Sequence, residues 1–108
     1  MSYEIKTDKA GKIRFNLKAA NGQIILSSEA YNDKAGALGG IASVQANGPD
    51  AANFEKKVSS SGQPYFSLKA KNGQIIGHSE MYSAEAARDN GIASVQKNSP
   101  STDVKEIA

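Results

Sequence analysis

The sequence predicts an α+β domain made of two tandem β-β-β-α(-β) repeats. A shift of 51 positions, which places Gly22 onto Gly73, aligns nearly the whole chain with itself. Each copy carries an Asn-Gly pair between two apolar runs, followed by a helical segment that ends at a proline. We therefore expect one domain over residues 1–108, with repeats at 1–50 and 51–108, an approximate two-fold axis and one antiparallel sheet with both helices on one face.

Three strands are expected in each repeat because apolar and polar residues alternate with the period of a half-buried strand. They span 3–6, 13–19 and 23–28 in the first copy, and 54–58, a run headed by Pro64, and 74–79 in the second. Asn-Gly favours a two-residue type I′ hairpin turn, which needs positive φ at both central residues. That turn would place Leu17 opposite Leu26 and Lys18 opposite Ile25.

One helix follows the third strand in each repeat. Asn32 and Ser83 are candidate N-caps, while Pro49 and Pro100 prevent the helices from continuing. Each helix also carries an internal glycine, at Gly40 and Gly91. Because such a glycine is about 1 kcal/mol less favourable than alanine, we expect a neighbouring element to pack too closely for a Cβ, with docking of a partner as the alternative.

The C-terminal segment maps onto the start of the second repeat. Residues 102–107 align with the region around Phe54–Lys56, so the tail is expected to form a final strand. Since its counterpart is also the first strand of the next unit, we expect Val104–Ile107 to cross back and pair with the half that holds Tyr3–Lys6. The terminal strand would then be swapped between halves.

Three shared motifs carry a family resemblance. They are Leu-Lys-Ala-x-Asn-Gly-x-x-Ile, Ser-Glu-x-Tyr and Gly-Ile-x-Ser-Val-x-x-Asn-x-Pro, and both copies contain them. With these motifs the chain resembles the YegP-like family of small bacterial proteins over almost its whole length. The resemblance implies tandem β-β-β-α-β units that share one sheet with swapped C-terminal strands. It brings no established activity, cofactor or catalytic residue.

Composition excludes several chemistries. Without cysteine, the chain can form no disulfide, thiolate zinc site, iron–sulfur cluster or cysteine nucleophile. A single histidine argues against Ser-His-Asp catalysis and a multi-histidine metal site, so we expect no enzyme activity, metal or cofactor. The start lacks a basic segment and an apolar signal region, and no run reaches membrane-spanning length, so a cytoplasmic location is expected. The two copies supply each other's contacts, which favours a monomer.

The sheet face opposite the helices is the candidate binding surface, because helices on one side leave the other side to solvent. Its lysines and arginine would meet anions, while isoleucine and tyrosine offer apolar contact. An ordinary solvated face with compensating charges is the alternative. The candidate residues are Arg14, Lys18, Ile25, Glu29, Tyr65, Lys69, Ile76, His78 and Glu80.

These residues support a non-catalytic binding or interaction protein, with a protein or nucleic acid as the possible partner. A net charge of +2 and the absence of paired aromatics weaken the nucleic-acid version. A small enzyme with its site near His78 and Glu80 is the alternative from another class. A deep pocket at these two residues would favour catalysis, whereas a flat basic face would favour binding.

Overall fold

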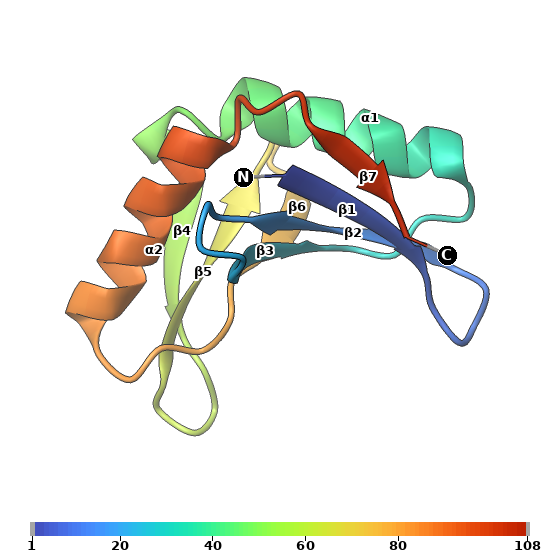
Figure 1. Ribbon diagram of the computed structural model, residues 1–108. Coiled ribbons are helices and arrows are strands. Elements are labelled where there is room, and N and C mark those ends of the chain that lie inside the picture. The colour runs from blue at the N-terminus through green and yellow to red at the C-terminus, as the bar shows by residue number, and fades with distance from the viewer. Residues whose placement is uncertain (1, 108) are drawn as a thin grey trace.

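The computed structural model describes residues 2–107 and contains two copies of one β-β-β-α unit (Figure 1). A short 3₁₀ turn, η1 (Ala51–Asn53), connects the copies. The elements are β1 (Ser2–Thr7), β2 (Ile13–Lys18), β3 (Ile24–Ser28) and α1 (Lys34–Asn47), then β4 (Phe54–Val58), β5 (Pro64–Lys69), β6 (Ile75–His78), α2 (Glu85–Asn98) and β7 (Val104–Glu106). The predicted α+β fold class is confirmed.

The strands form one seven-stranded sheet in the order β4-β5-β6-β3-β2-β1-β7. The halves join where β3 and β6 pair antiparallel, with Ser27 opposite His78. Figure 1 shows that β4 and β5 turn sharply away from β1 and β2. β7 pairs with β1, Tyr3 lying opposite Val104, so the predicted swap is confirmed. This pair is parallel, which makes the sheet mixed rather than wholly antiparallel as expected.

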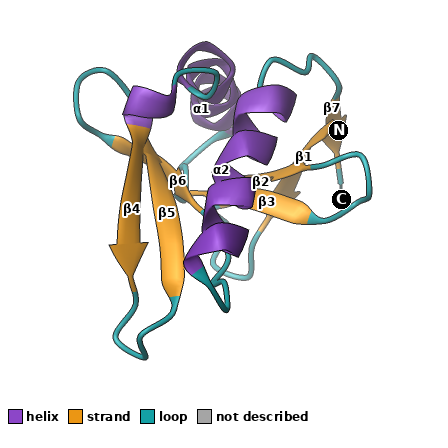
Figure 2. Cartoon of the chain, turned by 90° about the vertical axis from the view of Figure 1, so that its left-hand side faces the viewer, coloured by secondary structure: helices purple, strands orange, loops and turns teal. Residues whose placement is uncertain are grey.

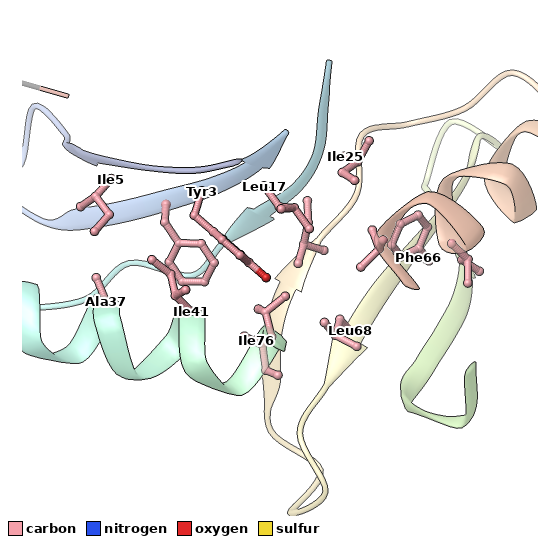
Figure 3. Close-up of a cluster of buried hydrophobic side chains, with 14 residues drawn as sticks. Tyr3, Ile5, Leu17, Ile25, Ala37, Ile41, Phe66, Leu68 and Ile76 are labelled. Carbon is pink, nitrogen blue, oxygen red and sulfur yellow. The ribbon is translucent and has the colours of Figure 1, made fainter. Parts of the chain in front are cut away.

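A single hydrophobic core lies between the sheet and the helices. Figure 3 shows it running from Ile5 and Ala37 at one end to Phe66 at the other, with Ile76 between them. Each helix contacts strands of both repeats, α1 reaching β5 and β6 and α2 reaching β2 and β3. The two repeats therefore share one core.

The helices begin one residue later than expected. Asp33, not Asn32, caps α1, and its carboxylate accepts a hydrogen bond from the Gly36 N–H at 2.7 Å. Ala84, not Ser83, precedes α2 and provides no side-chain cap. Both helices end before a proline, as predicted.

Gly40 and Gly91 lie against aromatic side chains. A Cβ on Gly40 would overlap the Tyr31 hydroxyl, and one on Gly91 would overlap the Tyr82 hydroxyl in the same way. The expectation that a neighbour packs too closely for a side chain is confirmed, because each tyrosine lies over its helix in both repeats.

The hairpin tips differ from the predicted type I′ turn. Gly22 has positive φ, but no residue other than glycine does in the described chain, so Asn21 keeps an ordinary conformation. Ala19 N–H donates to the Gln23 carbonyl and Gly22 N–H to the Ala19 carbonyl, which is a three-residue loop with a glycine bulge. The register then places Lys18 opposite Ile24, while Leu17 stays opposite Leu26. Ile25 is the extra, bulged residue.

Two pairs of repeat positions differ because they meet where the halves join. Leu26 of the first copy corresponds to Gly77, whose Cβ would come within 3.2 Å of the Leu26 side chain. Gly48 corresponds to Ser99, and a Cβ on Gly48 would overlap the Ser99 side chain. Space near the pseudo-two-fold axis admits only one side chain of each pair, which accounts for these departures from the repeat.

Candidate functional site

A row of polar residues crosses the sheet face opposite the helices. Directly opposed residues share a face, and the register connects six strands from β1 to β4 through one line of pairs. The row is Glu4, Asn16, Ser27, His78, Ser67 and Glu55. We call it the polar row. It places His78 at the centre of the predicted binding face.

The predicted cations on this face are paired with acids. Lys18 Nζ lies 3.0 Å from Glu4 Oε1, and Lys69 forms an ion pair with Glu55. Lys57 adds a second contact to Glu55, at 3.2 Å. Hydrogen bonds from Lys69 and Lys57 hold the pKa of Glu55 below its ordinary value. The face is thus largely self-compensating rather than an open basic surface.

Arg14 is paired in the same way at the edge of the face. Its Nε donates to the Asp8 carboxylate at 3.0 Å, in the loop between β1 and β2. This hydrogen bond, followed by one from the Lys12 N–H, lowers the pKa of Asp8. Arg14 is half exposed, so it keeps contact with solvent.

His78 connects the two repeats. Its Nε2 lies 2.8 Å from Glu29 Oε1, and its Nδ1 lies 2.9 Å from the Ser67 hydroxyl. Because a carboxylate only accepts, Nε2 donates to Glu29, and in the neutral ring Nδ1 accepts from Ser67. The Tyr65 ring lies nearby, with its centroid 6.5 Å from that of His78. The carboxylate bonded to His78 is thus that of Glu29.

Ile25 and Ile76 do not lie on the exposed face, and their predicted placement there is wrong. They are only 6% and 5% exposed and belong to the core. Each is the bulged residue of its strand, and a bulge turns two consecutive side chains toward the same side. Ile24 and Ile75 take the places opposite Lys18 and Lys69 instead.

The two lysines also do not form one continuous surface. Lys18 follows Asn16 on β2 by two residues, and Lys69 follows Ser67 on β5 by two residues. β2 pairs antiparallel with β3, β3 with β6 and β6 with β5, so β2 and β5 run in opposite directions. Lys18 and Lys69 therefore lie on opposite sides of the polar row. The two lysines thus do not lie side by side on this face.

Among the grooves that the described residues form, two that include predicted site residues are built from both repeats. Groove A, of about 750 Å³, lies between α1 and the tip of the β5–β6 hairpin. Groove B, of about 480 Å³, lies between the β2–β3 hairpin tip and the segment that carries Glu80 and Tyr82. Groove A is lined by Glu29, Tyr31, Gly36, Gly39, Gly40 and Ser43 from the first repeat and by Ala70, Asn72, Gly73, Gln74, Ile75 and Ile76 from the second.

The grooves correspond to each other under the repeat but differ in size. Glu29 and Tyr31 of groove A match Glu80 and Tyr82 of groove B. Gly39, however, matches Asn90 on α2, and the space beyond Gly39 is open within 4 Å of where a Cβ would lie. The glycines of α1 therefore widen groove A.

The lining of groove A combines apolar and polar groups, and it contains an acid but no lysine or arginine. Burial, and then the charge of Glu29, raise the pKa of the Tyr31 hydroxyl, which stays protonated and can donate. Asn72 accepts from the Gln74 N–H at 3.0 Å, which shapes the hairpin tip. Such a lining suits hydroxyl, amide or cationic groups better than anions.

Glu29 and Glu80 are exposed, as predicted from the sequence. Tyr31, Gly39 and Asn72, which line groove A together with Glu29, were not among the predicted site residues. Glu-x-Tyr and Asn-Gly-Gln are identical in both copies, which is the one signal available. It could not show that the motif of one copy meets that of the other, because this depends on how β3 and β6 pair.

Among residues 2–107, no three His, Cys, Asp or Glu side chains gather closely enough to hold a metal ion. Over the same range, neither helix has the length and apolar character that crossing a membrane requires.

Comparison with known proteins places the chain in a family. The model of a domain of unknown function, DUF1508, matches residues 8–55 and again residues 59–106. The UPF0339 protein YegP of Yersinia pestis is 57% identical over 105 residues, which cover 97% of this chain and 94% of the relative. Together these matches confirm the family resemblance seen in the sequence.

Two solution NMR structures share the fold. That of yegP from E. coli, a protein of unknown function, is 48% identical, with a TM-score of 0.91 over 96% of this chain and 90% of that one. That of a UPF0339 protein from Shewanella oneidensis is 51% identical, with a TM-score of 0.90 over 96% and 88%. Two family matches in tandem, close relatives over nearly the full length and the same fold show that this chain belongs to the DUF1508 family of UPF0339, YegP-like proteins.

Proposed function

We propose that the protein is a non-catalytic binding protein and that groove A is its ligand site. The observation that carries this proposal is the composite construction of the groove, in which α1 of one repeat faces the hairpin tip of the other. Binding there would involve both copies, which gives the duplication a role beyond folding.

The ligand class follows from the lining. Glu29, the Tyr31 hydroxyl, Ser43 and the amides of Asn72 and Gln74 offer hydrogen bonds, while Ile75 and Ile76 offer apolar contact. A carboxylate without a neighbouring cation in the lining disfavours an anion, since like charges repel. A small amine or a neutral, hydroxyl-rich molecule is the class that groove A would accept.

The surroundings of His78 support a structural rather than a catalytic role. Both ring nitrogens are already hydrogen-bonded, and the hydroxyl bonded to Nδ1 belongs to Ser67, which is 0% exposed. A nucleophile must meet its substrate, so a fully buried hydroxyl is a poor candidate. Nucleic-acid binding on the sheet face opposite the helices is disfavoured because Arg14, Lys18 and Lys69 are each paired with a carboxylate.

The test is an amide-shift titration of the isotope-labelled full chain. The probes are spermidine, glucose, inorganic phosphate and a short single-stranded oligonucleotide, each raised to about 10 mM or to its solubility limit, above the Kd of a weak complex. We expect spermidine or glucose to shift Gly39, Ser43 and Asn72, and phosphate to leave these amides unchanged.

A matched pair of variants locates the site. Gly39→Leu fills open space in groove A, whereas Asn90→Leu places the same side chain at the corresponding position of α2. The first variant should abolish the shifts, and the second should leave them in place. Shifts that survive Gly39→Leu, shifts on the polar row alone, or no shifts with any probe would each overturn the proposal.

A further inference from the structure

β4 has an unpaired edge that corresponds to a paired edge elsewhere in the same molecule. Its register to β5 repeats that of β1 to β2, with Phe54 opposite Leu68 as Tyr3 is opposite Leu17. The outer edge of β1 is covered by β7. β4 ends the sheet in the described part of the chain, and Figure 2 shows it at the border of the molecule.

The contact between β7 and β1 shows how such an edge receives a strand. Tyr3 N–H donates to the Asp103 carbonyl and Ile107 N–H donates to the Ile5 carbonyl, both at 2.8 Å. On the helix side, Lys34 Nζ lies 2.7 Å from Glu106 Oε2. Backbone bonds thus hold β7, and one ion pair joins it to the first turn of α1.

One of the corresponding backbone groups of β4 already has a hydrogen-bond partner. Phe54, the counterpart of Tyr3, donates its N–H to the Ala51 carbonyl of η1, so the first bond is not available there. Lys56 is the counterpart of Ile5, and its carbonyl therefore points to the outer edge. A strand added to β4 would start its ladder at Lys56.

Charge distinguishes the two edges. The repeat places Glu85, at the start of α2, where Lys34 stands on α1. The Glu85 side chain is 79% exposed, and its ion pair with Arg88 is long, at 3.9 Å. Lys56 is already paired with Asp89, at 3.2 Å. A strand beside β4 would thus meet an exposed carboxylate where β7 meets a lysine.

We propose that the β4 edge binds an extended segment of another protein as a parallel strand, with a lysine or arginine at the position that Glu106 occupies in β7. Strand addition to an exposed edge is a common mode of peptide recognition, in which the backbone supplies affinity and side chains supply specificity. A second copy of this chain fits poorly, because its own C-terminal strand would bring Glu106 against Glu85.

The test uses peptides that copy the chain's own seventh strand. The probe has the sequence of residues 101–108 with Glu106→Lys, and the control has the native sequence. With the labelled full chain, we expect the probe to shift the amides of Lys56 and Val58, and the native peptide to bind about two- to fivefold more weakly, the range of an exposed ion pair.

Two further variants separate strand addition from general attraction. A probe that also carries Ile107→Pro lacks the N–H that would donate to the Lys56 carbonyl, so it should not bind. Glu85→Lys in the full chain should reverse the order of the two peptides. Equal binding of the probe and native peptides, binding of the proline peptide, shifts on β1 instead of β4, or no shifts at all would overturn the inference.

Discussion

Gly39 and Gly40 are adjacent on α1, but only Gly40 has a neighbour where a side chain would start. The space at Gly39 is open, whereas at Gly40 the Tyr31 hydroxyl and the Phe15 ring already fill it. Gly39→Ala should therefore raise the free energy of unfolding by about 1 kcal/mol through helix propensity. Gly40→Ala should lower it by roughly 1–3 kcal/mol through overpacking. Urea denaturation of the two variants checks this, and equal stabilities would contradict the packing described here.

Ser99 offers a second residue-scale prediction. Its hydroxyl is fully buried and has no hydrogen-bond partner among the described residues, while its backbone carbonyl accepts from the Tyr3 hydroxyl at 2.6 Å. Because an unsatisfied buried hydroxyl is unfavourable, Ser99→Ala should leave stability unchanged or raise it by about 1 kcal/mol. Thermal unfolding measures the change. A clear loss of stability would mean that the hydroxyl has a partner.

At the scale of elements, β7 is held mainly by its backbone. Removing residues 101–108 would break the bonds to Tyr3 and Ile5, the bond from Gln45 to the Ser101 carbonyl and the pair between Lys34 and Glu106. We expect the truncated chain to lose about 2–3 kcal/mol, with faster amide exchange in β1. Chemical denaturation beside the full chain is the measurement. Equal stability would show that the swapped strand contributes nothing to the fold.

Two ion pairs connect β4 to β5 and α2, and the carboxylate of each pair has a lowered pKa. Lys69 and Lys57 lower the pKa of Glu55, and Lys56 followed by Arg88 lowers that of Asp89. A carboxyl whose pKa is lower in the folded state stabilises the fold above its unfolded pKa, and this contribution is lost as the pH falls through the folded value. Stability should therefore decrease between about pH 5 and pH 3.

Replacing one of these carboxylates tests the acid dependence. Glu55→Gln keeps the shape of the side chain but removes the titrating group, so its stability should vary less with pH over that range than that of the parent. Glu80 is exposed in the segment after β6, and Glu80→Gln serves as a control for the same change of net charge. An unchanged slope in Glu55→Gln would exclude Glu55 as a source of the dependence.

At the scale of the molecule, both repeats complete one core, and the chain is predicted to be a monomer. Bulged residues of each hairpin lie in the same cluster as residues of both helices. Light scattering at micromolar concentration should give about 11.3 kDa. A stable dimer would contradict this and would point to the outer edges of β4 and β7 as contacts between copies.

Local patterns predicted the elements well. Alternation located the strands, since residues 54–58 form β4 as expected and Pro64 does head β5. The offset of 51 residues correctly implied a shared sheet. It also aligned the C-terminal segment with the first strand of the second repeat, and this predicted the crossing of β7 to β1. The helix caps were misplaced by one residue. At α1, Asp33 takes the capping role that its polar neighbour Asn32 was predicted to have, and at α2 the residue before the helix is Ala84, which provides no side-chain cap.

The candidate site was less predictable. Lys18, Lys69 and Arg14 do lie on the polar face, but their pairing with acids depends on the strands beside them. Ile25 and Ile76 became core residues because a bulge in each hairpin shifted the register by one, and alternation alone cannot reveal a bulge.

Residue type and spacing along the chain are enough to predict the repeat, the order of the elements and the absence of cysteine chemistry. Which parts of the two copies meet depends on contacts in three dimensions. The antiparallel pairing of β3 with β6 places Glu29 beside His78, brings the second hairpin to α1 to form groove A and separates Lys18 from Lys69. These contacts join residues from different repeats, and the local pattern of each repeat carries little information about how the two are arranged against each other.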